Sequence, residues 1–81
     1  MSTTDPNEVR RNGFGTLVLE DERLYTTEQT AELLTLSPRQ VIDARHAKRL
    51  GCVRLSGAAV RHSGRQIREF IAARSVEAVQ P

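Results

Sequence analysis

Two short amphipathic segments lie next to each other near the middle of the chain. Apolar residues recur at helical spacing over residues 27–34, behind Thr26 and Gln29, which have the spacing of a capping box. A second pattern typical of a helix start begins at Ser37, so we expect a second helix over residues 38–48. Two short helices separated by so few residues are typical of a helix-turn-helix unit.

The segment that follows alternates between apolar and polar residues, as a half-buried hairpin does. Ser56 and Gly57 form a plausible two-residue turn. That turn would pair Leu55 with Ala58, Arg54 with Ala59, Val53 with Val60 and Cys52 with Arg61. In this register the two arginines share the solvent face of the hairpin, while Val53, Leu55, Ala58 and Val60 face the helices.

A third capping box, Ser63 with Gln66, precedes apolar residues at helical spacing: Ile67, Phe70 and Ile71. It predicts a closing helix over residues 64–74. The order of elements is then helix, turn, helix, two-stranded β-hairpin, helix. The sequence therefore predicts a mainly α fold with a small hairpin, a winged helix-turn-helix domain over residues 24–74.

The ends of the chain carry no clear periodicity. Residues 1–23 are expected to form a flexible arm, with enough apolar residues at 16–19 for a short strand and an exposed charged linker at 20–23. Residues 75–81 are expected to be a short tail. A chain of 81 residues has room for one small domain.

Charge is distributed unevenly although the net charge is only +2. Residues 1–36 contain seven acidic and three basic side chains, whereas residues 37–74 contain nine basic and two acidic ones. Eight of those nine are arginines, whose planar guanidinium suits phosphate groups and guanine edges. The charge pattern favours an anionic partner, which we expect to be double-stranded DNA.

The second helix would carry the base-reading residues. Helical periodicity places Arg39, Asp43 and His46 on one face, flanked by Gln40, with Val41 and Ala44 facing the first helix. Arginine can bind guanine, glutamine adenine, and aspartate cytosine. The arginines of the hairpin and the capped helix starts would contact phosphates. The expected DNA-binding residues are Thr27, Ser37, Pro38, Arg39, Gln40, Asp43, His46, Arg54, Ser56, Gly57 and Arg61. Arg45 is expected instead to pair with Glu32 or Glu28.

Catalytic, metal and membrane functions find little support in the sequence. Ser37 and Ser63 are interpreted as helix caps, and His46, Cys52 and His62 match no zinc-ligand spacing, so neither an enzyme nor a cofactor is expected. No apolar run approaches the roughly 20 residues that cross a bilayer. A single cysteine and the lack of a signal peptide indicate a cytosolic protein. The expected DNA partner would associate it with the nucleoid or host-cell DNA.

Residues 24–71 resemble the small winged-helix domains of the MerR-related excisionase superfamily. The resemblance rests on a Thr-capped first helix, a Ser-capped second helix, a basic-Leu-Gly exit, a glycine in the hairpin and a closing helix with Phe followed by Ile. The matching residues are Thr26, Glu28, Gln29, Ala31, Leu33, Leu34, Ser37, Arg49, Leu50, Gly57, Arg61 and Phe70. The chain departs from the family at Ala44, Arg45 and Val60, where bulkier or aromatic residues are common.

The resemblance implies an excisionase, a recombination directionality factor of bacteriophages and other mobile elements. Such a protein binds repeated sites, contacts its neighbouring copies, bends the DNA and directs a site-specific integrase towards excision. A small transcriptional repressor of the same fold, a DNA-packaging terminase subunit and a protein-binding adaptor remain alternatives. No small-molecule substrate is implied.

Overall fold

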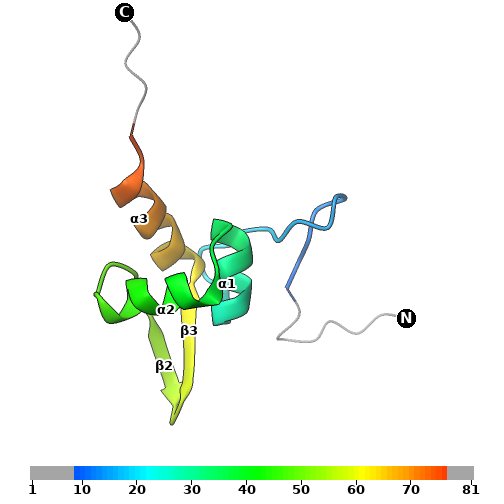
Figure 1. The fold of residues 1–81 in the computed structure, drawn as a ribbon. Coiled ribbons are helices and arrows are strands. Elements are labelled where there is room, and N and C mark those ends of the chain that lie inside the picture. The colour runs from blue at the N-terminus through cyan, green and yellow to red at the C-terminus, as the bar shows by residue number, and fades with distance from the viewer. Residues whose placement is uncertain (1–8, 77–81) are drawn as a thin grey trace, which may run out of the picture.

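The computed structural model describes residues 9–76, which form three helices and a small antiparallel sheet (Figure 1). The elements follow one another as β1 (Leu24–Tyr25), α1 (Thr27–Leu34), α2 (Pro38–His46), β2 (Val53–Ser56), β3 (Ala59–Ser63) and α3 (Gly64–Arg74). Within this part of the chain, no helix combines the length and apolar composition that crossing a membrane requires. The expectation of a mainly helical fold with a small sheet is confirmed.

All three predicted capping boxes are present. The hydroxyls of Thr26, Ser37 and Ser63 accept a hydrogen bond from the backbone N–H three residues on, and the glutamine there returns a bond to the backbone of the cap. These reciprocal bonds satisfy two otherwise unpaired donors at each helix start. The boundaries of α1 and α3 match the prediction. The second helix ends at His46, earlier than predicted.

The turn between α1 and α2 packs these two helices together. Thr35 adopts the left-handed conformation with φ 57°, and the N–H of Leu36 bonds to the carbonyl of Ala31 at 2.9 Å. Helix α1 therefore stops abruptly and the chain turns back into α2. The core formed behind the turn consists of Ala31, Val41, Ala44, Leu50 and Phe70. Leu33, one of the apolar residues of α1, is half-buried and is not part of this core.

The sheet has three strands in the order β1-β3-β2, one more strand than predicted. Leu24 and Tyr25 pair with Ser63 and His62, so a segment expected to lie outside the sheet forms its edge. Two residues are too few to show alternation in a sequence, and the pairing depends on the neighbouring strand. Tyr25 is fully buried there, and its hydroxyl donates to the carbonyl of Val18 at 2.7 Å.

The predicted register of the β2–β3 hairpin is wrong. Val53 pairs with Arg61, Arg54 with Val60 and Ser56 with Ala59, with an irregularity between Arg54 and Ser56. The turn residues are Gly57 and Ala58 in place of Ser56 and Gly57, and Gly57 has φ +49°. A tight hairpin turn needs a left-handed residue, which glycine supplies at little cost, and here it does so at the first turn position.

This shift separates the two arginines of the hairpin. Residues directly opposite each other in a ladder project to the same face. Arg61 therefore shares a face with Val53, while Arg54 lies on the other face with Val60. The expectation that Arg54 and Arg61 share a solvent face is wrong. Leu55, expected to face the helices, is 53% exposed.

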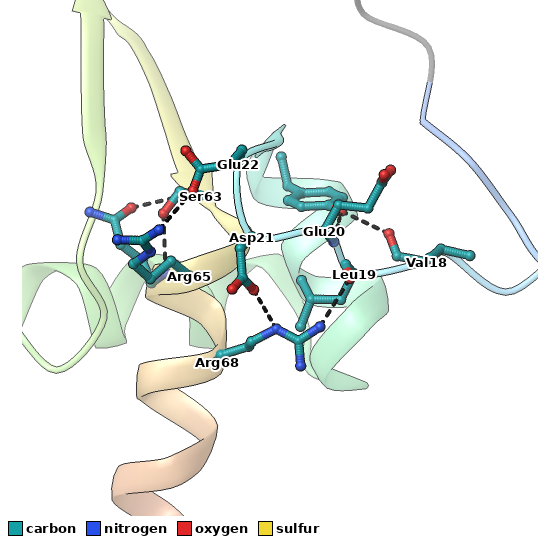
Figure 2. A network of polar contacts seen from close by, with 10 residues as sticks. Val18, Leu19, Glu20, Asp21, Glu22, Ser63, Arg65 and Arg68 are labelled. Atoms are coloured by element: carbon teal, nitrogen blue, oxygen red, sulfur yellow. Dashed lines mark hydrogen bonds and ion pairs between the residues drawn. The ribbon is translucent and has the colours of Figure 1, made fainter.

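Residues 18–23, which we call the N-terminal strap, pack across the start of α3 (Figure 2). The amides of Gly64 and Arg65 donate to the carbonyls of Arg23 and Asp21 at 3.0 and 3.1 Å. Arg65 also binds the carboxylate of Glu22 at 2.8 Å. The strap therefore supplies partners for two amides at the start of α3 that the helix itself cannot satisfy.

Arg68 forms the second side-chain anchor of the strap. Its guanidinium binds the carboxylate of Asp21 and donates to the carbonyl of Leu19 at 3.1 Å (Figure 2). Residues 18–23, expected to belong to a flexible arm, are bound to α3 by these contacts, while Asp21 and Glu22 are exposed as expected for the linker at 20–23. The part of the expectation that concerns residues 1–8 lies outside the described residues. The short strand considered at 16–19 is reduced to an isolated bridge between Leu17 and Arg11.

Candidate nucleic-acid interface

Helix α2 presents its polar face to solvent as the sequence predicts. Val41 and Ala44 are 0% and 4% exposed and belong to the core, whereas Arg39, Asp43 and His46 are exposed. Residues three, four and seven positions apart share one face of a helix, so burying the apolar side turns these three polar residues outward together.

Arg39 and Asp43 form an ion pair on this face, with 3.2 Å between Nε and Oδ1. Their side chains are 83% and 57% exposed, so water and salt screen the pair. An exposed pair of this kind is weak enough for the Arg39 guanidinium to exchange Asp43 for another acceptor.

Gln40 and Ser37 are occupied by the capping box of α2. The Gln40 side-chain carbonyl accepts from the Ser37 N–H at 2.9 Å, and the Ser37 hydroxyl accepts from the Gln40 N–H at 3.2 Å. Two-point binding of adenine needs both the carbonyl and the amino group of a glutamine side chain. Gln40 therefore cannot read adenine in the expected way while the cap is intact.

A basic hollow of about 380 Å³ opens at the C-terminal end of α2. It is lined by Arg45, His46, Lys48, Leu50, Gly51, Cys52 and Arg54, so none of the described residues around it is acidic. We call this surface the basic hollow. It brings Arg54 of the hairpin next to His46 on the exposed face of α2.

Lys48 and Arg45 also line the hollow, although neither is among the expected DNA-binding residues. After α2 ends, Lys48 takes the left-handed conformation with φ 60°, and the amides of Arg49 and Leu50 bond back to the carbonyl of Ala44. Leu50 is thereby buried at 2% exposure, and Lys48 remains exposed. The basic-Leu-Gly sequence after the helix was the available sign of this exit.

Arg45 does not pair with Glu32 or Glu28 as expected. Its guanidinium donates to the hydroxyl of Thr27 at 3.3 Å, whereas Glu32 is bound by Arg11 at 2.6 Å. The Arg11 guanidinium donates a hydrogen bond to Glu32 and so lowers the pKa of that carboxyl. The charge of Arg45 is consequently left to the basic hollow. Thr27, which was expected to contact a DNA phosphate, instead orients the Arg45 side chain through this hydrogen bond.

Arg61 lies in different surroundings. It lines a hollow of about 670 Å³ together with residues of the strap and of α1, including Glu20, Glu22 and Gln29. Its guanidinium donates to the carbonyl of Val60 at 3.0 Å. Carboxylates next to Arg61 lower the positive potential there. The three arginines expected to act together are separated, because Arg61 lines this hollow, Arg54 lines the basic hollow and Arg39 lines neither.

The remaining expected site residues are exposed. Pro38 lies at the start of α2, and Ser56 and Gly57 lie at the tip of the hairpin. Both positions are accessible to a large partner. Neither carries charge, so they can contribute backbone or hydroxyl contacts only.

His62 is buried at the base of the hairpin and is 0% exposed. Its Nδ1 lies 2.7 Å from the carbonyl of Gly51, which only accepts, so Nδ1 carries the proton. Burial lowers the pKa of His62, and the nearby positive charge of Arg45 lowers it further. In residues 9–76 no three His, Cys, Asp or Glu side chains are arranged to hold a metal ion.

No protein-family model matches the sequence, and no curated protein or solved structure is significantly similar to this chain.

Proposed function

We propose that this protein binds double-stranded DNA as a winged helix-turn-helix domain, with α2 as the recognition helix and β2–β3 as the wing. The observation that carries the proposal is the basic hollow, because four positively charged or ionisable bases surround one concavity beside the exposed face of α2. A recognition helix enters the major groove while a neighbouring hairpin contacts the backbone.

Different residues would have different roles at this surface. Arg39 is exposed near the N-terminal end of α2, where side chains of a recognition helix reach base edges, and can bind the two acceptors of guanine. Arg45, Lys48 and Arg54 surround the hollow and would contact phosphates. Arg61 is not part of the proposed interface, because it lies beside the carboxylates of the strap.

Within this class we propose the role of an excisionase, which directs a site-specific integrase towards excision. The support for this role is the resemblance of residues 24–71 to the excisionase superfamily. Directing an integrase requires DNA binding and no catalytic group of the protein's own, so a small domain suffices for it. Dependence of recombination direction on this protein, measured with an integrase and its attachment sites, tests that role. Binding to a single operator with no effect on an integrase would instead indicate a repressor.

DNA binding itself is tested by measuring affinity for a duplex at several salt concentrations. Release of counterions from DNA makes log K fall with log salt by about 0.9 per phosphate contact. Lys48→Ala should make this slope shallower by about one contact and weaken all sequences alike. Arg10→Ala is the matched control, because that arginine is exposed, does not line the hollow and forms an ion pair with Glu20.

Sequence reading is tested with Arg39→Ala. Loss of a two-point guanine contact should cost about 1–3 kcal/mol on the preferred site and relax the base preference. Binding that does not depend on salt, or that is unchanged in both variants, would contradict the proposal and favour an adaptor that docks an acidic protein.

A further inference from the structure

The first turns of α3 carry two exposed arginines that the proposed interface does not use. Arg65 and Arg68 are three residues apart, so their side chains leave the same side of the helix. The two side chains are 65% and 56% exposed, and neither lines the basic hollow. Arginines spaced in this way can each bind a DNA phosphate. By its own sequence, the start of α3 is therefore suited to be a second surface for DNA.

Both arginines are instead bound by consecutive carboxylates of the N-terminal strap, as Figure 2 shows. The Glu22 carboxylate lies 2.8 Å from the Arg65 guanidinium, and the Asp21 carboxylate binds Arg68. The members of these pairs are 43 and 47 residues apart in the sequence. Only the folded strap brings each carboxylate to its arginine, and the two positive charges at the start of α3 are thereby paired within the chain.

Other contacts also hold the strap in place. The buried Tyr25 hydroxyl donates to the Val18 carbonyl at 2.7 Å and accepts from the Glu20 N–H at 2.8 Å. Two amides at the start of α3 donate to carbonyls of the strap at 3.0 and 3.1 Å. Ion pairs as exposed as those of Asp21 and Glu22 add little to stability. The position of the strap therefore does not require the charges of Asp21 and Glu22.

We propose that Asp21 and Glu22 are built-in counterions that keep DNA off α3 and so confine it to the basic hollow. An arginine that already has a carboxylate partner must lose it before it binds a phosphate, so the exchange gains little free energy. Removing the two carboxylates should turn the start of α3 into a second DNA-binding surface that does not depend on sequence. The inference rests on the proposed function, because it concerns where the same ligand binds.

Confinement of this kind favours binding that depends on sequence. Phosphate contacts position a duplex but carry no sequence information, and such binding competes with the specific site. A duplex held by Arg65 and Arg68 would lie on α3, whereas the exposed Arg39 that is proposed to read guanine lies on α2. Pairing the two arginines within the chain therefore favours the orientation in which α2 meets the major groove.

The test compares the wild type with Asp21→Asn/Glu22→Gln, as full chains, on one short duplex of arbitrary sequence at several salt concentrations. The amides keep the size of the two side chains and remove their charge. The slope of log K against log salt should become steeper by about 0.9 for each freed arginine, or about 1.8 for both. Adding Arg65→Gln and Arg68→Gln to this variant should return the slope to that of the wild type.

Glu22→Gln and Glu69→Gln form a matched pair, because each replaces one exposed glutamate by its amide. Glu69 lies on α3 but forms no ion pair within residues 9–76. Glu22→Gln should steepen the slope by about 0.9, and Glu69→Gln by less than about half as much, since it frees no arginine. Hydrogen exchange in residues 18–23 should be the same in the double variant as in the wild type, because the strap stays in place.

Three results would overturn the inference. The first is a double variant with the slope of the wild type, and the second is a steeper slope that persists after both arginines are replaced. The third is faster hydrogen exchange in the strap of the double variant, which would assign the carboxylates a structural role. A wild type that does not bind the duplex would contradict the proposed function, whereas the inference is judged by the difference between the double variant and the wild type.

Discussion

Gly64 is the residue that allows the strap to lie against α3. A Cβ atom at this position would lie 2.0 Å from the carbonyl oxygen of Glu20 and 2.5 Å from its carbonyl carbon. Both are backbone atoms, so the strap itself would have to move. The close approach is what lets Arg23 and Asp21 accept from the first amides of α3.

Gly64→Ala should therefore destabilise the protein by roughly 1–3 kcal/mol, although glycine to alanine in a helix ordinarily stabilises. The sign of the change in the free energy of unfolding is the measurement, together with faster hydrogen exchange in residues 18–23. Gly13→Ala is the control, because no atom lies within 4 Å of a Cβ there. An equally or more stable Gly64→Ala variant would show that the strap does not pack as described.

His62 makes stability depend on pH. Its Nε2 is buried without a hydrogen-bond partner among the described residues, so an added proton would place an unpaired positive charge in the core. Burial and Arg45 lower the folded pKa below the ordinary value, while the bond to Gly51 opposes them. The unfolded chain therefore binds a proton at a pH where the folded protein does not.

The free energy of unfolding should be highest above pH 6.5, the ordinary histidine value, and fall as pH drops below it towards the lowered folded pKa. Denaturant unfolding between about pH 8 and pH 5 measures this. His62→Asn keeps an N–H donor near Gly51 but does not titrate, so its stability should change less over the same range. An equal pH dependence in the two proteins would assign the effect to other groups.

At the scale of elements, the β2–β3 hairpin divides its charges between two environments. Its Arg54 face borders the basic hollow at the end of α2, and its Arg61 face borders the acidic strap. The division follows from the register, because moving the turn to Gly57 and Ala58 changes which residues lie opposite each other. A shift of one residue thus changes which arginine can serve the proposed interface.

Arg54→Ala should weaken DNA binding and make the salt dependence shallower by about one phosphate contact. Arg61→Ala should change the Kd by less than about twofold, because its neighbours are carboxylates and an exposed charge outside an interface contributes little. Binding curves of the two variants on one duplex measure the contrast. A larger loss for Arg61→Ala would place the DNA on the opposite face of the hairpin.

At the scale of the whole molecule, the uneven charge along the sequence becomes an uneven charge in space. The strap carboxylates bind Arg65 and Arg68 of α3, and Glu32 binds Arg11, so many of the arginines are neutralised locally. Within residues 9–76, no ion pair involves the arginines and the lysine that line the basic hollow. Positive charge is therefore retained at the C-terminal end of α2, which is what the proposed DNA interface requires.

The sequence by itself determined the helices of this protein. Capping boxes and helical spacing act within a few residues, so the starts of all three helices and the outward face of α2 could be predicted from Thr26, Ser37 and Ser63 and the residues that follow them. The presence of a hairpin was predictable for the same reason, since alternation is also a local pattern.

Only the tertiary structure decided the third strand, the hairpin register, the partner of Arg45 and the packing of the strap. Each depends on contacts between residues far apart in the chain, such as Tyr25 with His62 or Asp21 with Arg68, which a local pattern does not encode. The exposed arginines could be identified from the sequence. Which of them keep their charge free depends on where the folded chain brings the carboxylates.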